Sequence, residues 1–429
     1  MGNEIRFPFL FSKRNSVSLI KLFAIDISPL KRNREFRFLF FGQLVSFWGT
    51  VITNVALSFQ IYEMTKSTAY VGILGVIQLV PLSISGFIGG AVADRLDRKR
   101  IIVVSEILLA VASLLYAFLA VWSGSKIWMI FAVAAFTSFL SGFHRPALEA
   151  TTPRLVTSEE IPAVGALSGV RGTTGMIFGP ALAGIILSSM GLVWTYLIDA
   201  ATFVVSICCV LLIRKQFQLE REAHEQSTFT QIRDGLRYAW ERPLLLGTYF
   251  VDMASMTFAF PYPLYPELAT KFGNTQALGI LYAAAAVGSF IASITSGWIT
   301  SVRRHGKTIA LAAAGWCIGI IFAGFSSSLW TIFIWLAAAG FADMVSAMFR
   351  STVWNQTIPD SVRGRLAGVE MLSYLSGPML GGTLMGFAAS SVGTSRAMMV
   401  GGCIGIAIIV VMVLWLKEFW KYEAKRREQ

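Results

Sequence analysis

The amino-acid sequence predicts an all-α membrane protein with twelve transmembrane helices in two pseudo-symmetric six-helix bundles. Three observations predict it: the chain is unusually apolar, its apolar stretches have the length of membrane-spanning helices, and one glycine-proline pattern occurs twice. Hydrophobic residues make up 55% of the 429 residues and charged residues only 14%, whereas soluble domains are about 25% charged. The chain therefore has too little polar surface for a water-soluble globule of this size.

The predicted spans follow from the thickness of the bilayer. Its hydrocarbon core is about 30 Å thick, so a spanning helix needs about 20 mainly apolar residues. Strands are excluded for such segments unless they close into a barrel, because lipid offers no partner for backbone hydrogen bonds. Twelve stretches meet the length criterion, and they cover residues 37–62, 70–93, 101–122, 127–146, 163–188, 192–213, 243–267, 277–300, 307–326, 329–349, 365–389 and 396–416.

The longest polar gap falls between the sixth and seventh predicted spans and divides the chain into two halves. The apolar pieces before the first span are shorter than a spanning helix, so they are not counted as a span. We expect five regions: a cytoplasmic N-terminal leader (residues 1–36), an N-terminal six-helix bundle (37–213), a cytoplasmic linker (214–242), a C-terminal six-helix bundle (243–416) and a basic cytoplasmic tail (417–429).

The distribution of basic residues predicts the orientation. If the N-terminus is placed in the cytoplasm, most of the 36 lysines and arginines fall in cytoplasmic gaps, and the gaps on the other side hold only Lys66, Lys126, Lys271 and Arg396. This is the positive-inside asymmetry of membrane proteins. It predicts a multi-pass protein of the bacterial inner (plasma) membrane with both termini in the cytoplasm. It also accounts for the net charge of +12 without a nucleic-acid partner.

No pattern in the sequence is typical of an enzyme, a metal site or a cofactor site. The four cysteines all lie within apolar stretches and the three histidines are scattered, so metal-ligand spacings are missing. We therefore expect no metal, no cofactor and no catalytic residues. The expected partners are a small-molecule substrate, protons and the lipid bilayer, and the chain could act as a monomer.

An internal repeat supports the division into two halves. Residues 175–184 read GMIFGPALAG in the fifth predicted span, and residues 373–382 read SYLSGPMLGG in the eleventh. The shared glycine-proline pair is Gly179-Pro180 in the first copy. Copies that lie six spans apart are typical of transporters built from two similar halves, although glycine-rich helices can also match by chance.

The gap after the second span carries another pattern, Gly90-x-x-x-Asp94-Arg95-x-Asp97-Arg98. It resembles the signature of the major facilitator superfamily, in which the position of Asp97 is usually glycine. The resemblance implies the twelve-helix major facilitator fold. It also implies that Gly90, Asp94, Arg95 and Arg98 form a conformational latch on the cytoplasmic side. Basic residues that only hold the loop in the cytoplasm would explain the arginines, but not the Asp-Arg pair at this distance from Gly90.

The repeated glycine-proline pattern is also informative by itself. Gly175, Gly179, Pro180 and Gly184 resemble the antiporter signature of exporting branches of the superfamily. Small residues let two helices approach closely, and a proline bends its helix, so such a helix can rock against its neighbour. Ordinary glycine packing, which is common in membrane helices, is the alternative interpretation.

Further patterns narrow the resemblance to the drug:proton antiporter branch. Residues 264–269 (LYPELA), 279–284 (GILYAA) and 295–297 (TSG) occur in the order found in the bacterial exporters of the siderophore enterobactin. The resemblance implies proton-coupled export of a small amphipathic molecule, a siderophore or a drug-like compound as in multidrug efflux, by alternating access. A lysophospholipid or other lipid flippase of the same fold and an uptake transporter are the alternatives.

Polar residues at helical spacing indicate which spans line a pathway, because residues three or four positions apart share a face. In the superfamily, spans 1, 4, 7 and 10 surround the central pathway, and these spans carry most of the polar stripes. Our substrate-binding candidates are Gln43, Thr50, Asn54, Arg171, Tyr262 and Arg350. Hydrogen bonding between helices, without any solute, is the alternative for the polar stripes and for Arg171.

Charged residues within the spans need a partner, water or a function, because insertion at a helix centre costs about 2.5–3.5 kcal/mol. Asp252 is the first candidate for a proton-carrying carboxylate, followed by Glu370 and Asp343. Removal of water favours the protonated form of a carboxylate, which is the property that a proton carrier requires. A structural ion pair with Arg350 is the alternative for Asp343. We expect Asp199 to be a structural hydrogen-bonding group.

Overall fold

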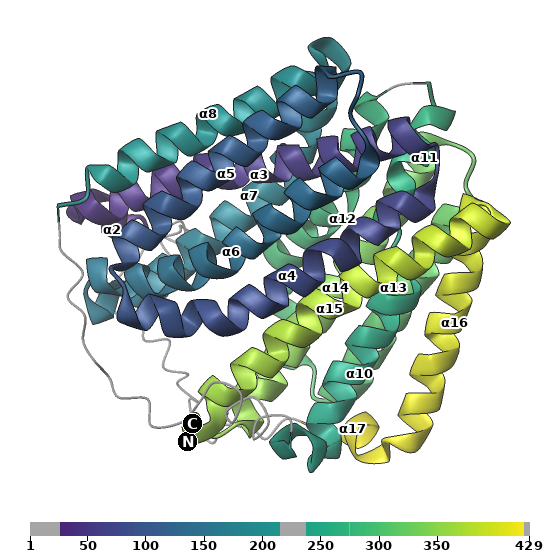
Figure 1. The fold of residues 1–429 in the computed structure, drawn as a ribbon. Helices are drawn as coiled ribbons and strands as arrows, with labels where there is room; N and C mark the ends of the chain where they lie inside the picture. Colours follow the sequence, from purple (N-terminus) through teal and green to yellow (C-terminus); the bar gives the residue numbers. More distant parts are fainter. Residues whose placement is uncertain (1–25, 215–236, 274, 424–429) are drawn as a thin grey trace, which may run out of the picture.

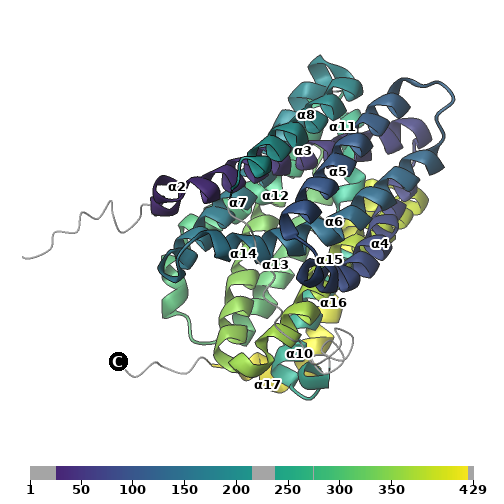
Figure 2. The same ribbon diagram turned by 60° about the vertical axis from the view of Figure 1, so that its left-hand side comes forward.

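The fold is that of a computed structural model, in which the chain is almost entirely helical (Figures 1 and 2). The structure describes residues 26–214, 237–273 and 275–423, without the side chains of residues 87, 90, 91, 93–95, 300 and 360–375. In the described part of the chain no strand is present. The all-α class predicted from the sequence is confirmed.

The first half of the chain forms one group of tightly packed helices. Extensive contacts join α4 to α6, α3 to α8, α5 to α8, α5 to α6 and α3 to α7. The elements of this group are α2 (Ser28–Arg32), α3 (Arg34–Thr65), α4 (Thr68–Arg95), α5 (Arg98–Val121), α6 (Ile127–Leu155), the 3₁₀ turn η1 (Ser158–Glu160), α7 (Ile161–Ser189) and α8 (Gly191–Leu211).

The second half forms a similar group, in which α14 packs on α12 and α13, α13 packs on α16, and α10 packs on α15 and α16. Its elements are α10 (Pro243–Phe258), η2 (Tyr262–Leu264), α11 (Tyr265–Lys271), α12 (Gln276–Ile294), η3 (Ser296–Ser301), α13 (His305–Phe325), α14 (Leu329–Thr357), α15 (Asp360–Val392), α16 (Thr394–Trp415) and α17 (Lys417–Lys421).

The spans expected from hydropathy match the helices closely. Among the described residues, 11 helical segments are long and apolar enough to cross a membrane. The predicted span at 365–389 corresponds to α15, which has 33 residues. The predicted span at 277–300 is shorter as an α-helix than expected, because α12 ends at Ile294 and the chain continues as the 3₁₀ turn η3.

The seventh predicted span, residues 243–267, is not one continuous helix. The α-helix α10 ends at Phe258, and the chain resumes as η2 and then α11. Pro261, Pro263 and Pro266 crowd this stretch, and each proline lacks the N–H that a helix needs. Side chains satisfy two carbonyls at the break: Trp316 donates to the oxygen of Ala259 at 2.9 Å, and Tyr282 donates to that of Tyr262 at 3.2 Å.

The two groups of helices meet along two helix pairs, α4 with α15 and α7 with α12. In the first pair, Thr68 Oγ1 donates to the carbonyl of Gly386 at 2.9 Å, and Thr383 Oγ1 donates to the carbonyl of Gly72 at 2.7 Å. In the second pair, a Cβ on Gly184 would lie 3.1 Å from Gly279 Cα. Both views show the groups converging near α11 and spreading apart toward α2 and α17 (Figures 1 and 2).

The backbones of α7 and α12 approach so closely that only glycine fits at their contact. We expect Gly279→Ala to lower the thermal unfolding midpoint of the purified protein by a few degrees, because the added methyl group would collide with the carbonyl oxygen of Pro180. A loss of about 1 kcal/mol corresponds to roughly 2–4 °C in domains of 150–250 residues.

Gly165→Ala on α7 is the matched control, because no atom lies within 4 Å of the position that its Cβ would take. Alanine is a better helix former than glycine by about 1 kcal/mol, so this variant should unfold at the same temperature or higher. Equal destabilisation by both substitutions would contradict the proposed packing constraint.

Candidate transport cavity

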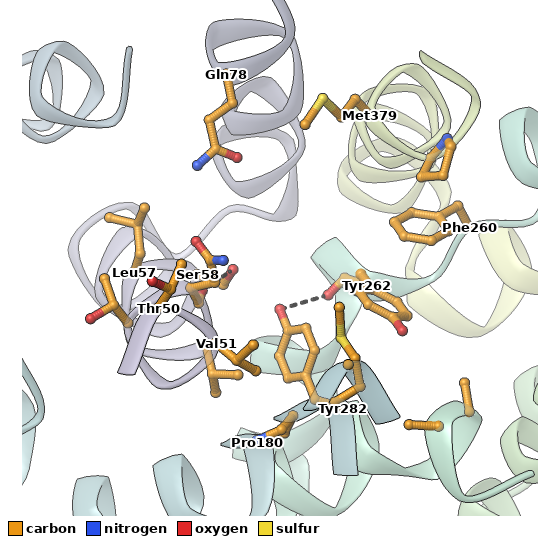
Figure 3. Close-up of a pocket in the computed structure, with 18 of the residues that line it drawn as sticks. Thr50, Val51, Leu57, Ser58, Gln78, Pro180, Phe260, Tyr262, Tyr282 and Met379 are labelled. Carbon is orange, nitrogen blue, oxygen red and sulfur yellow. Dashed lines mark hydrogen bonds between the residues drawn. The ribbon is translucent and has the colours of Figure 1, made fainter. Parts of the chain in front are cut away.

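A cavity of about 870 Å³ lies between the two groups of helices. Its lining comes from α3, α4, α5, α6, α7 and α8 of the first group and from α10, α12, α13, α14 and α15 of the second. Figure 3 shows part of this lining, with Thr50 and Ser58 of α3 on one side and Tyr262 and Tyr282 on the other. The cavity is therefore a space shared by both halves of the chain.

The cavity wall formed by α3 is polar, and its hydroxyl groups donate hydrogen bonds to backbone carbonyls of the same helix. Thr50, Asn54 and Ser58 lie four residues apart on one helix face and all line the cavity. Thr50 Oγ1 donates to the carbonyl of Ser46 at 3.0 Å, and Ser58 Oγ donates to that of Asn54 at 3.0 Å. Such bonds leave the lone pairs of each hydroxyl free to accept. This wall therefore suits hydrogen-bond donors as well as water.

The break after α10 brings an aromatic cluster into the cavity. Phe260 and Tyr262 stack with ring centroids 4.4 Å apart and an interplanar angle of 24°. Tyr282 of α12 meets Tyr262 edge to face at 5.3 Å, and Trp316 of α13 also lines the space. Aromatic rings offer broad apolar faces with little conformational entropy to lose. The cluster is suited to a flat or apolar part of a solute.

The second group of helices also contributes a buried cluster of charges. Arg350 of α14 forms an ion pair with Asp252 of α10, and its Nη2 lies 4.0 Å from Oδ1 of Asp343, also on α14. The side chains of Arg350 and Asp252 are only 5% and 12% exposed. All three residues line the cavity. We call these three residues the acidic cluster.

The acidic cluster holds two carboxylates for one guanidinium. In a site of low dielectric constant, one guanidinium can neutralise one carboxylate, and the second carboxylate then carries an unbalanced charge unless it binds a proton or a cation. The arrangement therefore provides a place where one proton can be gained or lost. Asp343, which is 33% exposed and farther from the guanidinium than Asp252, is the more accessible of the two.

The structure brings most of the sequence-based site residues to this cavity and leaves two outside it. The candidates that line it are Thr50, Asn54, Tyr262, Arg350, Asp252 and Asp343. Gln43 is placed elsewhere: its amide donates to Glu106 Oε1 at 2.7 Å and to Ser206 Oγ at 3.1 Å within the first group of helices. Arg171 is half-buried on α7 and lies outside the described lining, although its neighbour Gly172 belongs to it.

The residues of the predicted latch are only partly described. The side chains of Gly90, Asp94 and Arg95 lie outside the described residues. Arg98 Nη1 donates to the carbonyl of Ala150 at 3.1 Å and so ties the start of α5 to α6. Asp97 occupies the N-cap of α5, where its Oδ1 accepts from the backbone N–H of Lys99 at 2.9 Å. Aspartate is a favourable N-cap residue, which accounts for its presence at the position that is usually glycine.

The glycine-proline pattern of α7 faces two different neighbours. Gly179 packs against α3, where a Cβ added to the glycine would lie 2.7 Å from Val51 Cγ1. Gly175 packs against Phe47, which also belongs to α3. Pro180 and Gly184 instead face α12 of the other group. The pattern therefore joins α7 to a helix of its own group and to one of the opposite group.

The side chain of Glu370, the second proton-coupling candidate, lies outside the described residues.

Sequence reasoning missed several cavity residues, among them Gln78, Tyr116 and Met379. Figure 3 shows Gln78 of α4 beside Met379 of α15, on two helices that pack against each other. The sequence did contain a sign of Gln78, since an amide side chain inside an apolar span needs a hydrogen-bond partner or water. Tyr116 and Met379 had none, because aromatic and methionine side chains in a span usually pack against other helices or lipid.

The acidic cluster generates a stability prediction. We expect Arg350→Gln to lower the free energy of unfolding by about 3–5 kcal/mol at neutral pH, because breaking a buried pair leaves a carboxylate without its counter-charge. The loss should shrink as the pH falls, since a protonated carboxyl group needs no counter-charge. Thermal unfolding of the purified variant at neutral and at acidic pH measures both effects. Arg396→Gln, at an exposed position, is the control. A pH-independent loss would contradict the role assigned to Arg350.

Comparison with known proteins places the chain in a family. The sequence model of the family described as "Transmembrane secretion effector" matches residues 24–428. The enterobactin exporter EntS of Salmonella choleraesuis is 26% identical over 91% of this chain and 94% of its own length. The EntS of Escherichia coli O81 is 25% identical over 91% of this chain and 93% of its own length.

Solved structures share the fold at low sequence identity. The nucleoside transporter NupG superposes with a TM-score of 0.68 at 14% identity and covers 90% of this chain and 99% of its own. A POT family transporter in complex with a thioalcohol-conjugated peptide gives a TM-score of 0.69 at 12% identity, over 90% of this chain and 96% of its own. The cavity between two groups of helices and the match over nearly the whole chain lead to one conclusion. The chain belongs to the transmembrane secretion effector family and is a multi-pass membrane transporter of the major facilitator superfamily.

Proposed function

We propose that the chain exports a small amphipathic molecule across the bacterial inner membrane in exchange for protons. The observation that carries the proposal is the acidic cluster of Asp252, Asp343 and Arg350 in the wall of the cavity between the two groups of helices. Ionisable residues inside a membrane are costly and mark proton or substrate pathways in transporters. The relatives named enterobactin exporters support the direction of transport.

Proton coupling follows from the charge balance of the acidic cluster. When both carboxylates are ionised, the cluster has an excess negative charge that attracts a proton or a cationic group. When one carboxylate is protonated, the cluster is neutral and its attraction for a cation is lost. Because α10 and α14 carry its members, a change of protonation alters the force between these two helices. A proton bound on one side of the membrane can thus be exchanged for cargo on the other.

Alternating access supplies the second half of the mechanism. The contacts of α4 with α15 and of α7 with α12 close one end of the molecule. With the orientation predicted by the basic residues, that end faces away from the cytoplasm and the cavity opens inward. In the proposed cycle, the bundles at residues 37–213 and 243–416 rock about the cavity. The loop with Gly90, Asp94, Arg95 and Arg98 then closes the cytoplasmic side.

The cargo class follows from the size and lining of the cavity. A volume of about 870 Å³ lies within the range of about 300–1,000 Å³ typical of sites for drug-sized ligands. Its walls combine the aromatic cluster at Phe260, Tyr262 and Tyr282 with the polar face of α3. A siderophore or a drug-like compound, each with apolar and polar parts, fits this combination.

Substitution of Asp252 tests the coupling. In proteoliposomes with an imposed pH gradient, we expect the wild-type protein to accumulate enterobactin or ethidium and Asp252→Asn to lose this accumulation. The amide is nearly isosteric but cannot carry the proton. Downhill exchange of the same probe should persist in the variant, because the cavity is retained. Accumulation by Asp252→Asn at the wild-type level would overturn the coupling role, and failure of the wild type with both probes would overturn the cargo class.

Glu63→Gln is the matched control, because it removes a carboxylate near the end of α3 whose side chain is 39% exposed and pairs with Lys66 at 2.8 Å. Exposed ion pairs contribute little, typically about 0–1 kcal/mol. Accumulation by this variant should equal that of the wild type. A matching loss in both variants would show that the effect of Asp252→Asn is not specific to the acidic cluster.

The orientation is tested independently of transport. We expect green fluorescent protein fused to the C-terminus to fluoresce in the cytoplasm, since the distribution of basic residues predicts that both termini lie there. Alkaline phosphatase inserted in the gap at residues 122–126, between α5 and α6, should be active because the same distribution predicts that this gap faces the periplasm. The reverse pattern would overturn the orientation and, with it, the assignment of the closed end to the outer side.

A further inference from the structure

The short helix α17 lies at one end of the second group of helices, directly after the last predicted span. The spanning helix α16 ends at Trp415, and α17 begins at Lys417. Figure 1 shows α17 beside the start of α10, at the opposite end of the molecule from α11. With the orientation predicted by the basic residues, this end faces the cytoplasm. The helix α17 therefore lies where the chain leaves the membrane.

The side chain of Phe419 holds α17 against the protein. It is fully buried, and α17 packs on both α10 and α13. A Cβ added to Gly247 of α10 would collide with the Phe419 ring, and a Cβ added to Gly306 of α13 would collide with the Phe419 carbonyl oxygen. Close packing on two neighbours determines which face of α17 points inward, and so which face points outward.

The outward face of α17 carries two lysines. Lys417 precedes Phe419 by two residues and Lys421 follows it by two, and two residues correspond to a rotation of about 200° around a helix. Both lysines therefore point away from the buried ring. Both are exposed, and neither forms an ion pair within the part of the chain that the structure describes. Because they are four positions apart, their ammonium groups lie on the same side of α17.

More basic residues lie at the start of α13, next to α17. Arg303 and Arg304 directly precede α13, and Lys307 lies in its first turn. Lys307 Nζ is 5.9 Å from the centre of the Trp420 ring, and Arg304 Nε is 3.0 Å from Glu423 Oε1. These contacts bring the basic residues of α13 to the edge of α17. We define the α17 basic patch as the five residues Arg303, Arg304, Lys307, Lys417 and Lys421.

The last turns of α16 present an apolar surface just before these charges. Val411, Leu414 and Trp415 are strongly exposed, and their spacing of three and four residues places them on one helix face. Tryptophan is enriched where a membrane protein crosses the interface between lipid and water. An apolar face that ends at a basic patch is complementary to a lipid, which has acyl chains at one end and a headgroup at the other.

The charge of the patch favours an anionic headgroup. The acids of the same region are Glu418 and Glu423, and Glu423 is already paired with Arg304. Clusters of about four to eight basic residues directly cytoplasmic of a span are typical of binding to anionic lipids.

We propose that the α17 basic patch binds the phosphate headgroup of an anionic phospholipid, with Lys417 and Lys421 at the phosphate and the acyl chains along the exposed face of α16. None of these residues belongs to the described lining of the transport cavity. The inference goes beyond the proposed export function and does not depend on it.

Lipid binding to the full-length protein in detergent tests the inference without transport. Phosphatidylglycerol is anionic, and phosphatidylcholine with the same acyl chains has no net charge. Native mass spectrometry of the protein titrated with each lipid reports the two affinities. The wild type should bind phosphatidylglycerol at least about tenfold more tightly, because each basic residue near an anionic surface contributes about fivefold.

The double substitution of Lys417→Gln and Lys421→Gln should weaken phosphatidylglycerol binding by about 10–25-fold. The affinity for phosphatidylcholine should stay unchanged, which also shows that the variant is folded. Arginine at both positions keeps the charge and should keep the affinity. The matched control is Lys126→Gln with Arg396→Gln, which removes the same charge from exposed positions in gaps of the opposite predicted side. Its affinity for phosphatidylglycerol should stay within about twofold of the wild type.

Four outcomes would overturn the inference. They are equal affinity of the wild type for the two lipids, a phosphatidylglycerol affinity of the glutamine variant within about twofold of the wild type, equal weakening in the control variant, and displacement of the lipid by soluble glycerol 3-phosphate. The last outcome would show that the patch binds a free phosphate and not a lipid. None of these measurements concerns accumulation in proteoliposomes, so their failure leaves the proposed export function standing.

Discussion

The interior of a membrane protein has no bulk water to solvate charge, and this constraint shapes the whole cavity. Arg350 and Asp252 would each be costly alone in a span, but as partners on α14 and α10 they form a stable bridge between two helices. The same constraint acts on the backbone. Where α10 ends within the span, the freed carbonyls of Ala259 and Tyr262 accept hydrogen bonds from Trp316 and Tyr282, as non-helical backbone at membrane depth requires.

The charged side chains that line the cavity are distributed unevenly between the two halves of the chain. Its acids lie on both halves, at Asp199 and in the acidic cluster, while its basic group lies on one half only. The glycine contacts at Gly184 and Gly279 bring the two halves within reach of each other. Packing therefore sets how close the halves come, and electrostatics sets which solutes are stable between them.

The sequence predicted the broad architecture well, because hydropathy and charge report directly on the membrane environment. The all-α class and the position of nearly every span were correct. The break near Pro261 was not predicted, since the stretch is as apolar as a continuous span and hydropathy does not register the backbone N–H groups that its prolines lack. The partnership of Arg350 with Asp252 could not be predicted either, because periodicity relates residues on one helix and says nothing about which helices become neighbours.

Gln43 shows where periodicity misleads. It lies two turns before Thr50 on α3, and a straight helix rotates by about 20° over seven residues relative to an exact repeat. This rotation leaves the two residues on nearly the same face, but the amide of Gln43 donates to Glu106 of α5 and to Ser206 of α8, while Thr50 lies on the cavity wall. A polar stripe thus identifies the helix that lines a cavity more reliably than the exact residues.

The seventh predicted span is divided into two helices, α10 and α11. Because α10 and α11 are separate helices linked by the turn at Tyr262–Leu264, no continuous hydrogen-bonded helix joins α11 to the part of α10 that carries Asp252. A continuous helix would transmit every tilt at one face of the membrane to the other.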